Sequence, residues 1–236
     1  MRPFARVAAI IPFVAAPLGA ALAPPLTAQG AVSGRVLVRE KKGKAADDVA
    51  SAVVWLTGPE AAPVSPARRA QPPAPAQIIT EDREFRPRVL VVAVGATVTF
   101  PNLDPFNHNI FSTQPTPFDL GLYGRGEGPS QDFPDVGLVR IFCNIHARMS
   151  GFIHVIDSPH WTQPGSDGSF RITGVPAGAY ALHVWHERVG EEPTRQITVP
   201  AAGLANLTLE LDASGFKRVQ HLNKYGKPYG RTRERY

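Results

Sequence analysis

Short runs of alternating apolar and polar residues are the dominant pattern along this chain. The runs are rich in β-branched residues, and glycine, proline or charged turns separate them, as at residues 40–44 and 176–178. A period of two over four to eight residues is typical of a strand with one buried face. We expect strands over residues 32–38, 52–56, 89–94, 97–100, 137–143, 152–156, 169–172, 180–187, 196–199 and 206–211.

Helical periodicity is absent from every ten-residue stretch, and the composition agrees with this. Among 236 residues there are 24 prolines and 21 glycines, and the proline share is about twice the usual value of roughly 5%. A hydrophobic content of 43% with only 19% charged residues excludes an intrinsically disordered chain. We therefore predict an all-β protein whose short, closely spaced strands suit β-sandwiches.

The N-terminus has the three-part layout of a secretory signal. Arg2 and Arg6 precede an apolar run over residues 7–23, and small residues ending at Ala28 follow it. We predict a signal peptide over residues 1–28 and a periplasmic or secreted mature protein. The alternative is an uncleaved anchor, but the run contains Pro12 and Pro17 and is shorter than the roughly 20 residues that span a bilayer.

The net charge of +5 is concentrated at the C-terminus, where residues 216–236 hold seven basic residues and one acidic residue. The rest of the mature chain is slightly acidic. Basic residues interleaved with aromatic ones on a folded surface would indicate nucleic-acid binding, and the sequence has none, so we expect no nucleic-acid partner. We interpret residues 214–236 as a solvated basic tail. Contact with an acidic partner or an anionic surface is the alternative.

The single cysteine, Cys143, excludes an intramolecular disulfide. In an exported protein such a thiol is free, reactive or a metal ligand. It ends an alternating strand and shares a face with Val139 and Ile141, so a core-facing strand would shield the sulfur from water. A buried small hydrophobe is the alternative interpretation of a lone cysteine.

Two potential ligands follow Cys143 at intervals of three residues. His146 and Met149 lie on a short loop that can bring an imidazole, a thiolate and a thioether to one ion. His108, about 35 residues upstream, would complete a trigonal His₂Cys set with a weak axial methionine, which suits copper. Zinc prefers four strong nitrogen, sulfur or oxygen ligands. Alternatively, Met149 only fills the core, or His108 is an ordinary surface histidine.

These motifs resemble the cupredoxin family, in particular the plastocyanin and amicyanin type of blue copper protein. The resemblance covers residues 79–157 and rests on Phe85-Arg86-Pro87, residues 94–102, His108-Asn109 and the Cys-x₂-His-x₂-Met motif of residues 143–149. It implies an eight-stranded Greek-key sandwich with one type 1 copper ion bound by His108, Cys143, His146 and Met149. Residues 112–132 show little of the family pattern.

The resemblance also implies roles beyond those of the metal ligands. Asn109 matches the asparagine that braces the two ligand loops near the thiolate, which is a role in the second coordination shell. His146 matches the electron port, and we expect an apolar surface patch around it from Phe106, Ile110, Ile145 and Met149. The other histidines, His154, His160, His183, His186 and His221, are expected to be structural or exposed, without a second metal site.

A second resemblance concerns the flanking segments. Residues 166–182, together with the strands at residues 34–38 and 52–56, are similar to the carboxypeptidase regulatory-like, transthyretin-like sandwich. We predict that residues 31–58 and 158–213 form this smaller sandwich, that residues 59–78 are a Pro/Ala-rich linker, and that the cupredoxin domain of residues 79–157 is inserted between them. Trp185-His186-Glu187 is expected to serve packing rather than recognition.

These observations predict an exported, mononuclear type 1 copper protein that carries single electrons between a donor and an acceptor protein, as in amicyanin-dependent methylamine utilisation. The alternative is a copper-sequestering or surface interaction protein in which the copper is structural. We do not expect an enzyme, because a copper oxidase or nitrite reductase would need a further histidine-rich copper centre, and the sequence offers none.

Overall fold

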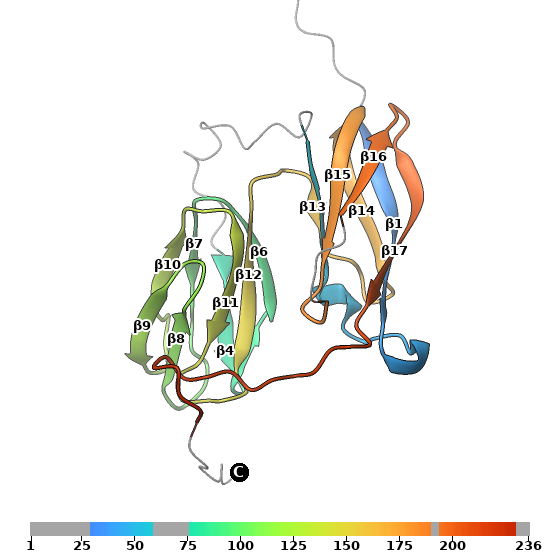
Figure 1. Ribbon diagram of the computed structural model, residues 1–236. Helices are drawn as coiled ribbons and strands as arrows, with labels where there is room; N and C mark the ends of the chain where they lie inside the picture. The colour runs from blue at the N-terminus through green and yellow to red at the C-terminus, as the bar shows by residue number, and fades with distance from the viewer. Residues whose placement is uncertain (1–28, 59–75, 190–193, 230–236) are drawn as a thin grey trace, which may run out of the picture.

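The computed structural model describes residues 29–58, 76–189 and 194–229. The predicted signal peptide, most of the predicted linker and residues 230–236 lie outside this part of the chain. The described residues form two β-sandwiches side by side (Figure 1), which confirms the all-β prediction. Their two helical turns, η1 (Lys41–Gly43) and η2 (Val49–Ser51), have three residues each. Neither has the length or the apolar character needed to span a bilayer.

The first sandwich, here the central sandwich, uses residues 76–156. A five-stranded sheet in the order β6-β12-β11-β8-β9 packs against a three-stranded sheet in the order β10-β7-β3, and β4 and β5 form a separate hairpin. Its strands are β3 (Ala76–Gln77), β4 (Ile79–Glu81), β5 (Glu84–Arg86), β6 (Val89–Ala93), β7 (Ala96–Thr99), β8 (His108–Ser112), β9 (Phe118–Tyr123), β10 (Ser130–Phe133), β11 (Gly137–Phe142) and β12 (Ser150–Ile156).

The core of the central sandwich explains which of its strands could be predicted. β11 alternates between buried and exposed residues, with Val139 and Ile141 inside and Arg140 outside. All five residues of β8 are buried although three of them, His108, Asn109 and Ser112, are polar. β8 therefore shows neither an alternating pattern nor the apolar run by which β2 and β12 could be predicted. The core residues from both sheets include Ile78, Phe85, Val98, Phe100, Ile110, Phe133, Val139, Ile141, Cys143, Met149 and Ile153.

The second sandwich, here the terminal sandwich, is built from the two ends of the described chain. β1 pairs antiparallel with β14 and parallel with β17, while β2 pairs with β13 and β15. Residues 31–58 therefore complete a sandwich with residues 158–213. The strands are β1 (Gln29–Arg39), β2 (Val53–Thr57), β13 (Trp161–Thr162), β14 (Ser169–Pro176), β15 (Gly178–Trp185), β16 (Thr194–Val199) and β17 (Leu204–Asp212).

One close contact inside the terminal sandwich requires a glycine. A Cβ atom at Gly34 would lie 2.1 Å from the backbone oxygen of Leu207, where β1 runs beside β17. Any larger residue there would push the two strands apart. The core between the two sheets is apolar and includes Val36, Val54, Leu56, Ile172, Tyr180, Leu182, Val199 and Leu211.

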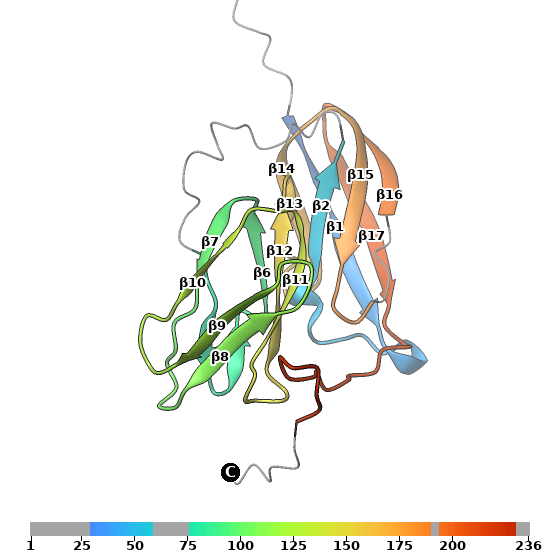
Figure 2. The ribbon, with the colours of Figure 1, turned by 60° about the vertical axis from the view of Figure 1, so that its left-hand side comes forward.

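An apolar interface joins the two sandwiches. Outer-face residues of β2 and β15 pack on those of β6 and β12, and Figure 2 shows the sandwiches beside each other in a second view. Trp55 meets His154 edge-on at 4.6 Å between ring centroids, and Trp185 meets Phe152 at 5.1 Å. The buried set is Val53, Trp55, Val89, Val91, Phe152, Ile156 and Trp185.

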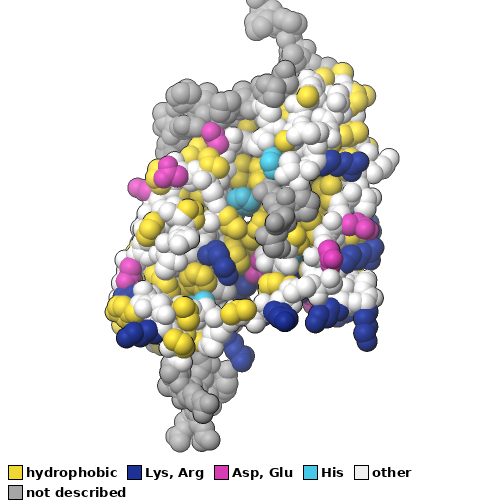
Figure 3. Space-filling model, in the orientation of Figure 1, with side chains coloured by type: hydrophobic (Ala, Val, Ile, Leu, Met, Phe, Trp, Pro, Cys, Tyr) yellow, Lys and Arg dark blue, Asp and Glu magenta, His cyan; other side chains and the backbone are white. Residues whose placement is uncertain are grey.

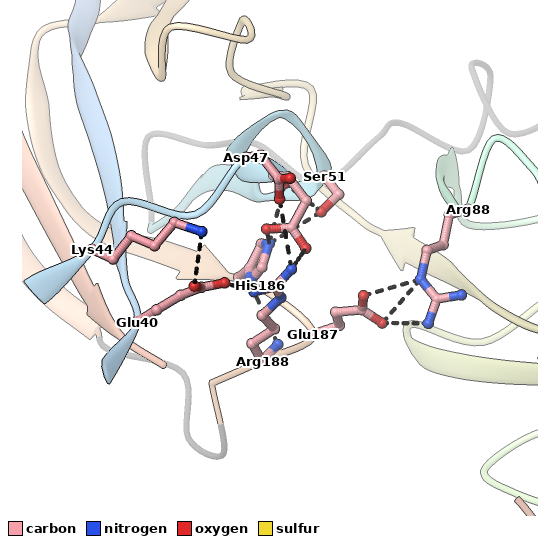
Figure 4. A network of polar contacts seen from close by, with 9 residues as sticks. Glu40, Lys44, Asp47, Ser51, Arg88, His186, Glu187 and Arg188 are labelled. Atoms are coloured by element: carbon pink, nitrogen blue, oxygen red, sulfur yellow. Dashed lines mark hydrogen bonds and ion pairs between the residues drawn. The ribbon is translucent and has the colours of Figure 1, made fainter. Parts of the chain in front are cut away.

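Polar contacts border this interface (Figure 4). Arg88 of the central sandwich pairs with Glu187 of the terminal one, with 2.7 Å between Nη2 and Oε2, and the Glu187 side chain is buried. Burial raises the pKa of Glu187, but hydrogen bonds and charge from Arg88 outweigh it and hold this pKa below its usual value. His186 is also buried and lies 3.1 Å from Ser51 Oγ. Trp185 and Glu187 thus contribute to the interface between the sandwiches, and His186 contacts η2 within the terminal sandwich.

Residues 214–229, here the C-terminal segment, leave β17 and run across the lower end of both sandwiches (Figures 1 and 2). Lysine and arginine side chains gather along this lower edge (Figure 3). The segment packs on the central sandwich, where the His221 ring lies 4.7 Å from the Phe142 ring. Most of residues 214–229 are exposed, as expected for a solvated segment, but contacts of His221, Lys224 and Tyr229 hold it to the surface of the central sandwich.

Candidate metal centre

Strand topology brings the predicted ligands together at one end of the central sandwich. His108 begins β8, and Cys143 directly follows the end of β11. β8 and β11 are antiparallel neighbours, paired at Phe111 and Phe142, so the start of one lies beside the end of the other. Residues separated by 35 positions in the sequence therefore share one site.

His108 is fully buried, and its orientation is fixed by an aspartate. Its Nε2 lies 2.7 Å from Asp104 Oδ2. An ionised carboxylate only accepts hydrogen bonds, so Nε2 carries the ring proton and Nδ1 keeps its lone pair. Burial lowers the pKa of His108 below its usual value, although Asp104 acts in the opposite direction. The lowered pKa favours the neutral ring that a metal requires.

The Asp104 carboxylate is itself held in place. It accepts hydrogen bonds from the backbone N–H groups of Asp82 at 2.9 Å and Arg83 at 3.1 Å. Burial raises the pKa of Asp104, but these bonds and the one from His108 outweigh it and lower the pKa. The fully buried Asn102 also supports this loop, because its Oδ1 accepts from the Asp104 N–H at 2.9 Å. Asp104 was not predicted as a partner of His108.

Cys143 is fully buried on the same face as Val139 and Ile141, which confirms the predicted direction of its side chain. Burial raises the pKa of its thiol, while hydrogen bonds from the backbone N–H groups of Asn109, Ile145 and His146 act in the opposite direction. The sulfur therefore lies in an apolar core but faces three N–H donors. These donors suit a thiolate, which a bound cation would further stabilise.

Residues 143–149, here the ligand loop, are closed by their own backbone. The Cys143 N–H donates to the Met149 carbonyl at 3.1 Å, and the Met149 N–H donates to the His146 carbonyl at 3.0 Å. His146 Nδ1 lies 3.5 Å from Cys143 Sγ. Met149 is 2% exposed and belongs to the same core cluster as Cys143. The side chains of Cys143 and Met149, at the two ends of the loop, therefore both point into the core.

Three donor atoms converge in this arrangement. His108 Nδ1 and His146 Nδ1 lie 3.8 and 3.5 Å from Cys143 Sγ, and ligand atoms of the three residues all lie within 4.8 Å of one another. Metal–nitrogen bonds of about 2.0 Å and metal–sulfur bonds of about 2.3 Å, at trigonal angles, separate nitrogen from sulfur by about 3.7 Å. The observed distances between nitrogen and sulfur therefore match those expected around a single metal ion. Two imidazoles, one thiolate and a nearby thioether favour copper over zinc.

Asn109 contributes to the site differently from the role that the family resemblance implies. Its side-chain Nδ2 donates to Asp119 Oδ1 at 2.6 Å and to the Gly121 carbonyl at 2.8 Å, both on β9. Its Oδ1 has no hydrogen-bond partner among the described residues. The side chain therefore ties β8 to β9, and it is the backbone N–H of Asn109 that faces the Cys143 sulfur.

The apolar surface near His146 is smaller than predicted. Ile145 is 45% exposed, and the half-buried Phe106 ring lies 5.7 Å from the His146 ring. Ile110 and Met149 are buried, so their predicted place in a surface patch is wrong. Their apolar character serves the core instead.

The remaining histidines occupy structural positions. His154 lies in the interface between the sandwiches, while His160 and His186 are buried in or beside the terminal sandwich. His183 stacks on Trp55, and His221 packs on Phe142. Within residues 29–58, 76–189 and 194–229, His108, Cys143 and His146 form the one group of three metal-binding residue types close enough to share an ion.

Comparisons with solved structures return copper proteins over part of the chain. A purple cupredoxin from Nitrosopumilus maritimus is 26% identical and covers 34% of this chain and 99% of its own, with a TM-score of 0.31. A mutant amicyanin in its reduced Cu(I) form is 21% identical and covers 43% and 98%, with a TM-score of 0.34. A copper-containing nitrite reductase from Thermus scotoductus SA-01 is 31% identical and covers 42% and 27%, with a TM-score of 0.35.

No protein-family model and no curated protein sequence matches the chain. The similarity to solved structures extends over less than half of the chain in each case. The assignment of the site therefore depends on its own geometry, which is that of two oriented imidazoles and a buried sulfur converging on one point.

Proposed function

We propose that this protein is an exported, mononuclear type 1 copper protein that carries single electrons between redox partner proteins. The observation that carries the proposal is the convergence of His108 Nδ1, His146 Nδ1 and Cys143 Sγ, with the tautomer of His108 fixed by Asp104. When bound, copper would supply a centre that alternates between two oxidation states by one electron.

The chain's own residues would limit rearrangement at this centre. His108 is held by Asp104, and Asp104 by two backbone N–H groups. The ligand loop is closed by hydrogen bonds between Cys143, His146 and Met149. Donors held at fixed positions change little between oxidation states, which is the requirement for fast electron transfer. Met149 would be a weak fourth ligand, because it is buried in the same core cluster as Cys143.

Electrons would enter and leave through His146. Cys143 and His108 are fully buried, whereas His146 is half-buried and lies beside the half-buried Phe106 and the exposed Ile145. A small apolar surface beside the exposed edge of His146 allows a partner protein to bind transiently. We propose donor and acceptor proteins of a dehydrogenase chain such as methylamine utilisation, because Cys143, His146 and Met149 have the spacing of the short amicyanin loop.

Export remains part of the proposal, since residues 1–28 have the layout of a signal peptide. In an oxidising compartment the single cysteine of a mature protein has no disulfide partner in its own chain. Use of the thiolate as a metal ligand accounts for its burial beside two histidines.

The test is the visible and EPR spectrum of the Cu(II)-loaded protein, followed by redox cycling. We expect an intense thiolate-to-copper band, stoichiometry of one ion per chain, and reversible reduction. Cys143→Ser should abolish the band, while His183→Gln, a histidine stacked on Trp55 away from the site, should retain it. Loading without reversible reduction would favour a structural or sequestering role, and an unchanged spectrum in Cys143→Ser would reject the ligand assignment.

A further inference from the structure

The C-terminal segment contacts the start of the ligand loop directly. Its Lys224 N–H donates to the side-chain Oδ1 of Asn144 at 2.9 Å, and Asn144 is the residue after Cys143. The Tyr229 hydroxyl donates to the Cys143 carbonyl at 2.7 Å. Two residues at the end of the chain therefore hold the start of the ligand loop from outside the sandwich.

The same lysine also reaches the neighbour of the other ligand. Lys224 Nζ lies 2.6 Å from Asp119 Oδ2, and Asp119 Oδ1 accepts from Asn109 Nδ2 at 2.6 Å. Asn109 directly follows His108. A continuous set of contacts thus runs from Asn109 through Asp119 and Lys224 to Asn144, connecting the residues that follow the first two ligands.

The part of the segment that carries Lys224 is rigid by its own hydrogen bonds. The Asn223 side-chain Oδ1 accepts from the N–H groups of Tyr225 and Lys227, both at 3.0 Å, and the Asn223 N–H donates to the Lys227 carbonyl at 2.9 Å. Gly226 has a φ of 72°, which suits a glycine in this tight turn. A pre-formed turn presents Lys224 with little further loss of conformational entropy.

Aromatic packing anchors the segment on either side of this turn. His221 lies on Phe142, the last residue of β11, and the Tyr229 ring meets the His221 ring edge-on at 5.2 Å. The Tyr229 oxygen also lies 3.3 Å from His221 Nδ1. The segment is therefore attached at His221, Lys224 and Tyr229, at the point where β11 becomes the ligand loop.

We propose that the C-terminal segment is a built-in brace of the metal centre, with Lys224 and Tyr229 as positioning residues. It connects the two ligand-bearing regions indirectly, which is the task that the family resemblance assigns to Asn109. Asn109 supplies one end of this connection, and the terminal sandwich supplies the anchor, because the segment begins where β17 ends. This inference rests on the proposed metal site.

The test uses full-length Lys224→Met, Tyr229→Phe and the double variant. Tyr229→Phe removes the bond to the Cys143 carbonyl, whereas Lys224→Met removes the anchor on Asp119 and keeps the backbone N–H that donates to Asn144. Loss of either contact should increase amide exchange of residues 143–149 in the metal-free protein by about fivefold, and loss of both by more than either alone. In the loaded protein the same variants should release copper to a chelator faster. Each should also shift the thiolate-to-copper band and the midpoint potential, because the geometry of Cys143 is no longer fixed.

Two matched controls separate bracing from general stability. Tyr180→Phe removes the same kind of bond, a tyrosine hydroxyl to a backbone carbonyl at 3.0 Å, inside the terminal sandwich. Lys227→Met removes an exposed charge from the same turn. Both controls should keep the wild-type band, potential and loop exchange.

Wild-type exchange of residues 143–149 in Lys224→Met and Tyr229→Phe, or equal changes in the controls, would overturn the proposed brace. Failure of the wild-type chain to bind copper would overturn the proposed function instead. The exchange measurement on metal-free protein would still decide whether the segment restrains the loop, so the two failures are distinguishable.

Discussion

The two sandwiches share a layered architecture but differ in what their cores contain. The terminal core is a continuous apolar cluster between two sheets. The central core carries buried polar side chains at one end, among them Asn102, Asp104, His108 and Asn109, and hydrogen bonds connect Asn102 to Asp104 and Asp104 to His108. Buried polar groups cost stability unless they are satisfied. The terminal sandwich also buries polar side chains, Ser158, His160 and His186. What distinguishes the central sandwich is that its buried polar groups adjoin the group of His108, Cys143 and His146 and hold one of its members in place.

Large-to-small substitutions in each core should make this difference measurable. They should lower the free energy of unfolding more than the other substitutions discussed below. Leu56→Ala in the terminal core and Ile141→Ala in the central core each remove a fully buried side chain and should lower the free energy of unfolding by about 2–5 kcal/mol. Only Ile141→Ala should also change the copper spectrum, because Ile141 packs beside Cys143. Denaturant unfolding and the visible spectrum measure both effects. Equal spectral changes in both variants would show that the two cores are not independent.

Replacing Asp104, the hydrogen-bond partner of His108, should lower the affinity for metal more than a comparable change in the terminal sandwich does. Asp104→Asn weakens the interaction that fixes the ring of His108, and loss of such a partner typically lowers metal affinity by about 10–100-fold. Ser158→Ala, which removes a buried hydroxyl that donates to the Leu56 carbonyl at 2.7 Å in the terminal sandwich, should leave the affinity unchanged. Competition with a chelator of known affinity provides the measurement. Wild-type affinity in Asp104→Asn would contradict the assigned role of Asp104.

The connection between the sandwiches should be sensitive to acid. The pKa of Glu187 is lower in the folded protein than its usual value, so the carboxylate stabilises the fold above its unfolded pKa of roughly 4.3. This contribution is lost as the pH falls through the lower, folded value. At neutral pH, Glu187→Gln should cost about 1–3 kcal/mol, and the difference from wild type should shrink on acidification.

Unfolding curves from pH 7 to pH 3 measure this dependence. Glu210→Gln, at an exposed pair with Arg39, is the control and should show little pH-dependent difference. A Glu187→Gln difference that stays constant across this range would contradict the assigned contribution of the carboxylate.

Surface charges of the terminal sandwich should matter least. The Arg35–Asp167 pair is 3.7 Å long, with both side chains more than half exposed. Arg35→Ala should change the free energy of unfolding by less than about 1 kcal/mol and leave the copper spectrum unchanged. Thermal unfolding at low and high salt measures the effect. A larger loss would show that this pair is coupled to the core.

Most of the terminal sandwich could be predicted because its strands alternate along the sequence. β14 alternates between buried and more exposed residues over most of its length, and β15 alternates between core residues and the partly buried residues of its outer face, which faces the central sandwich. In the central sandwich, β8 buries the polar residues His108, Asn109 and Ser112 beside two apolar ones, and the glycine- and proline-containing region around β9 and β10 has weak periodicity. Those strands could not be predicted, since their pattern depends on neighbours that are distant in the sequence.

The candidate ligands could be predicted because ligand types at short spacing are visible in the sequence. Cys143, His146 and Met149 share one loop, and His108 is the histidine that the resemblance assigns to the first ligand position. Their supports could not be predicted. Lys224 contacts Asp119, which is 105 residues away in the sequence, and Tyr229 contacts Cys143, which is 86 residues away. Only the fold brings such pairs together, and nothing in the composition of a basic tail indicates that it packs on the surface.

The insertion of one sandwich into the other has a consequence for biogenesis. β1 lies beside β17, which is synthesised more than 160 residues later, so the terminal sandwich cannot close until nearly the whole polypeptide has been made. The central sandwich is complete much earlier, and units made first generally fold first. During that interval β1 lacks its partner β17, so its β-branched, apolar residues and unpaired backbone are exposed to aggregation until synthesis is almost complete.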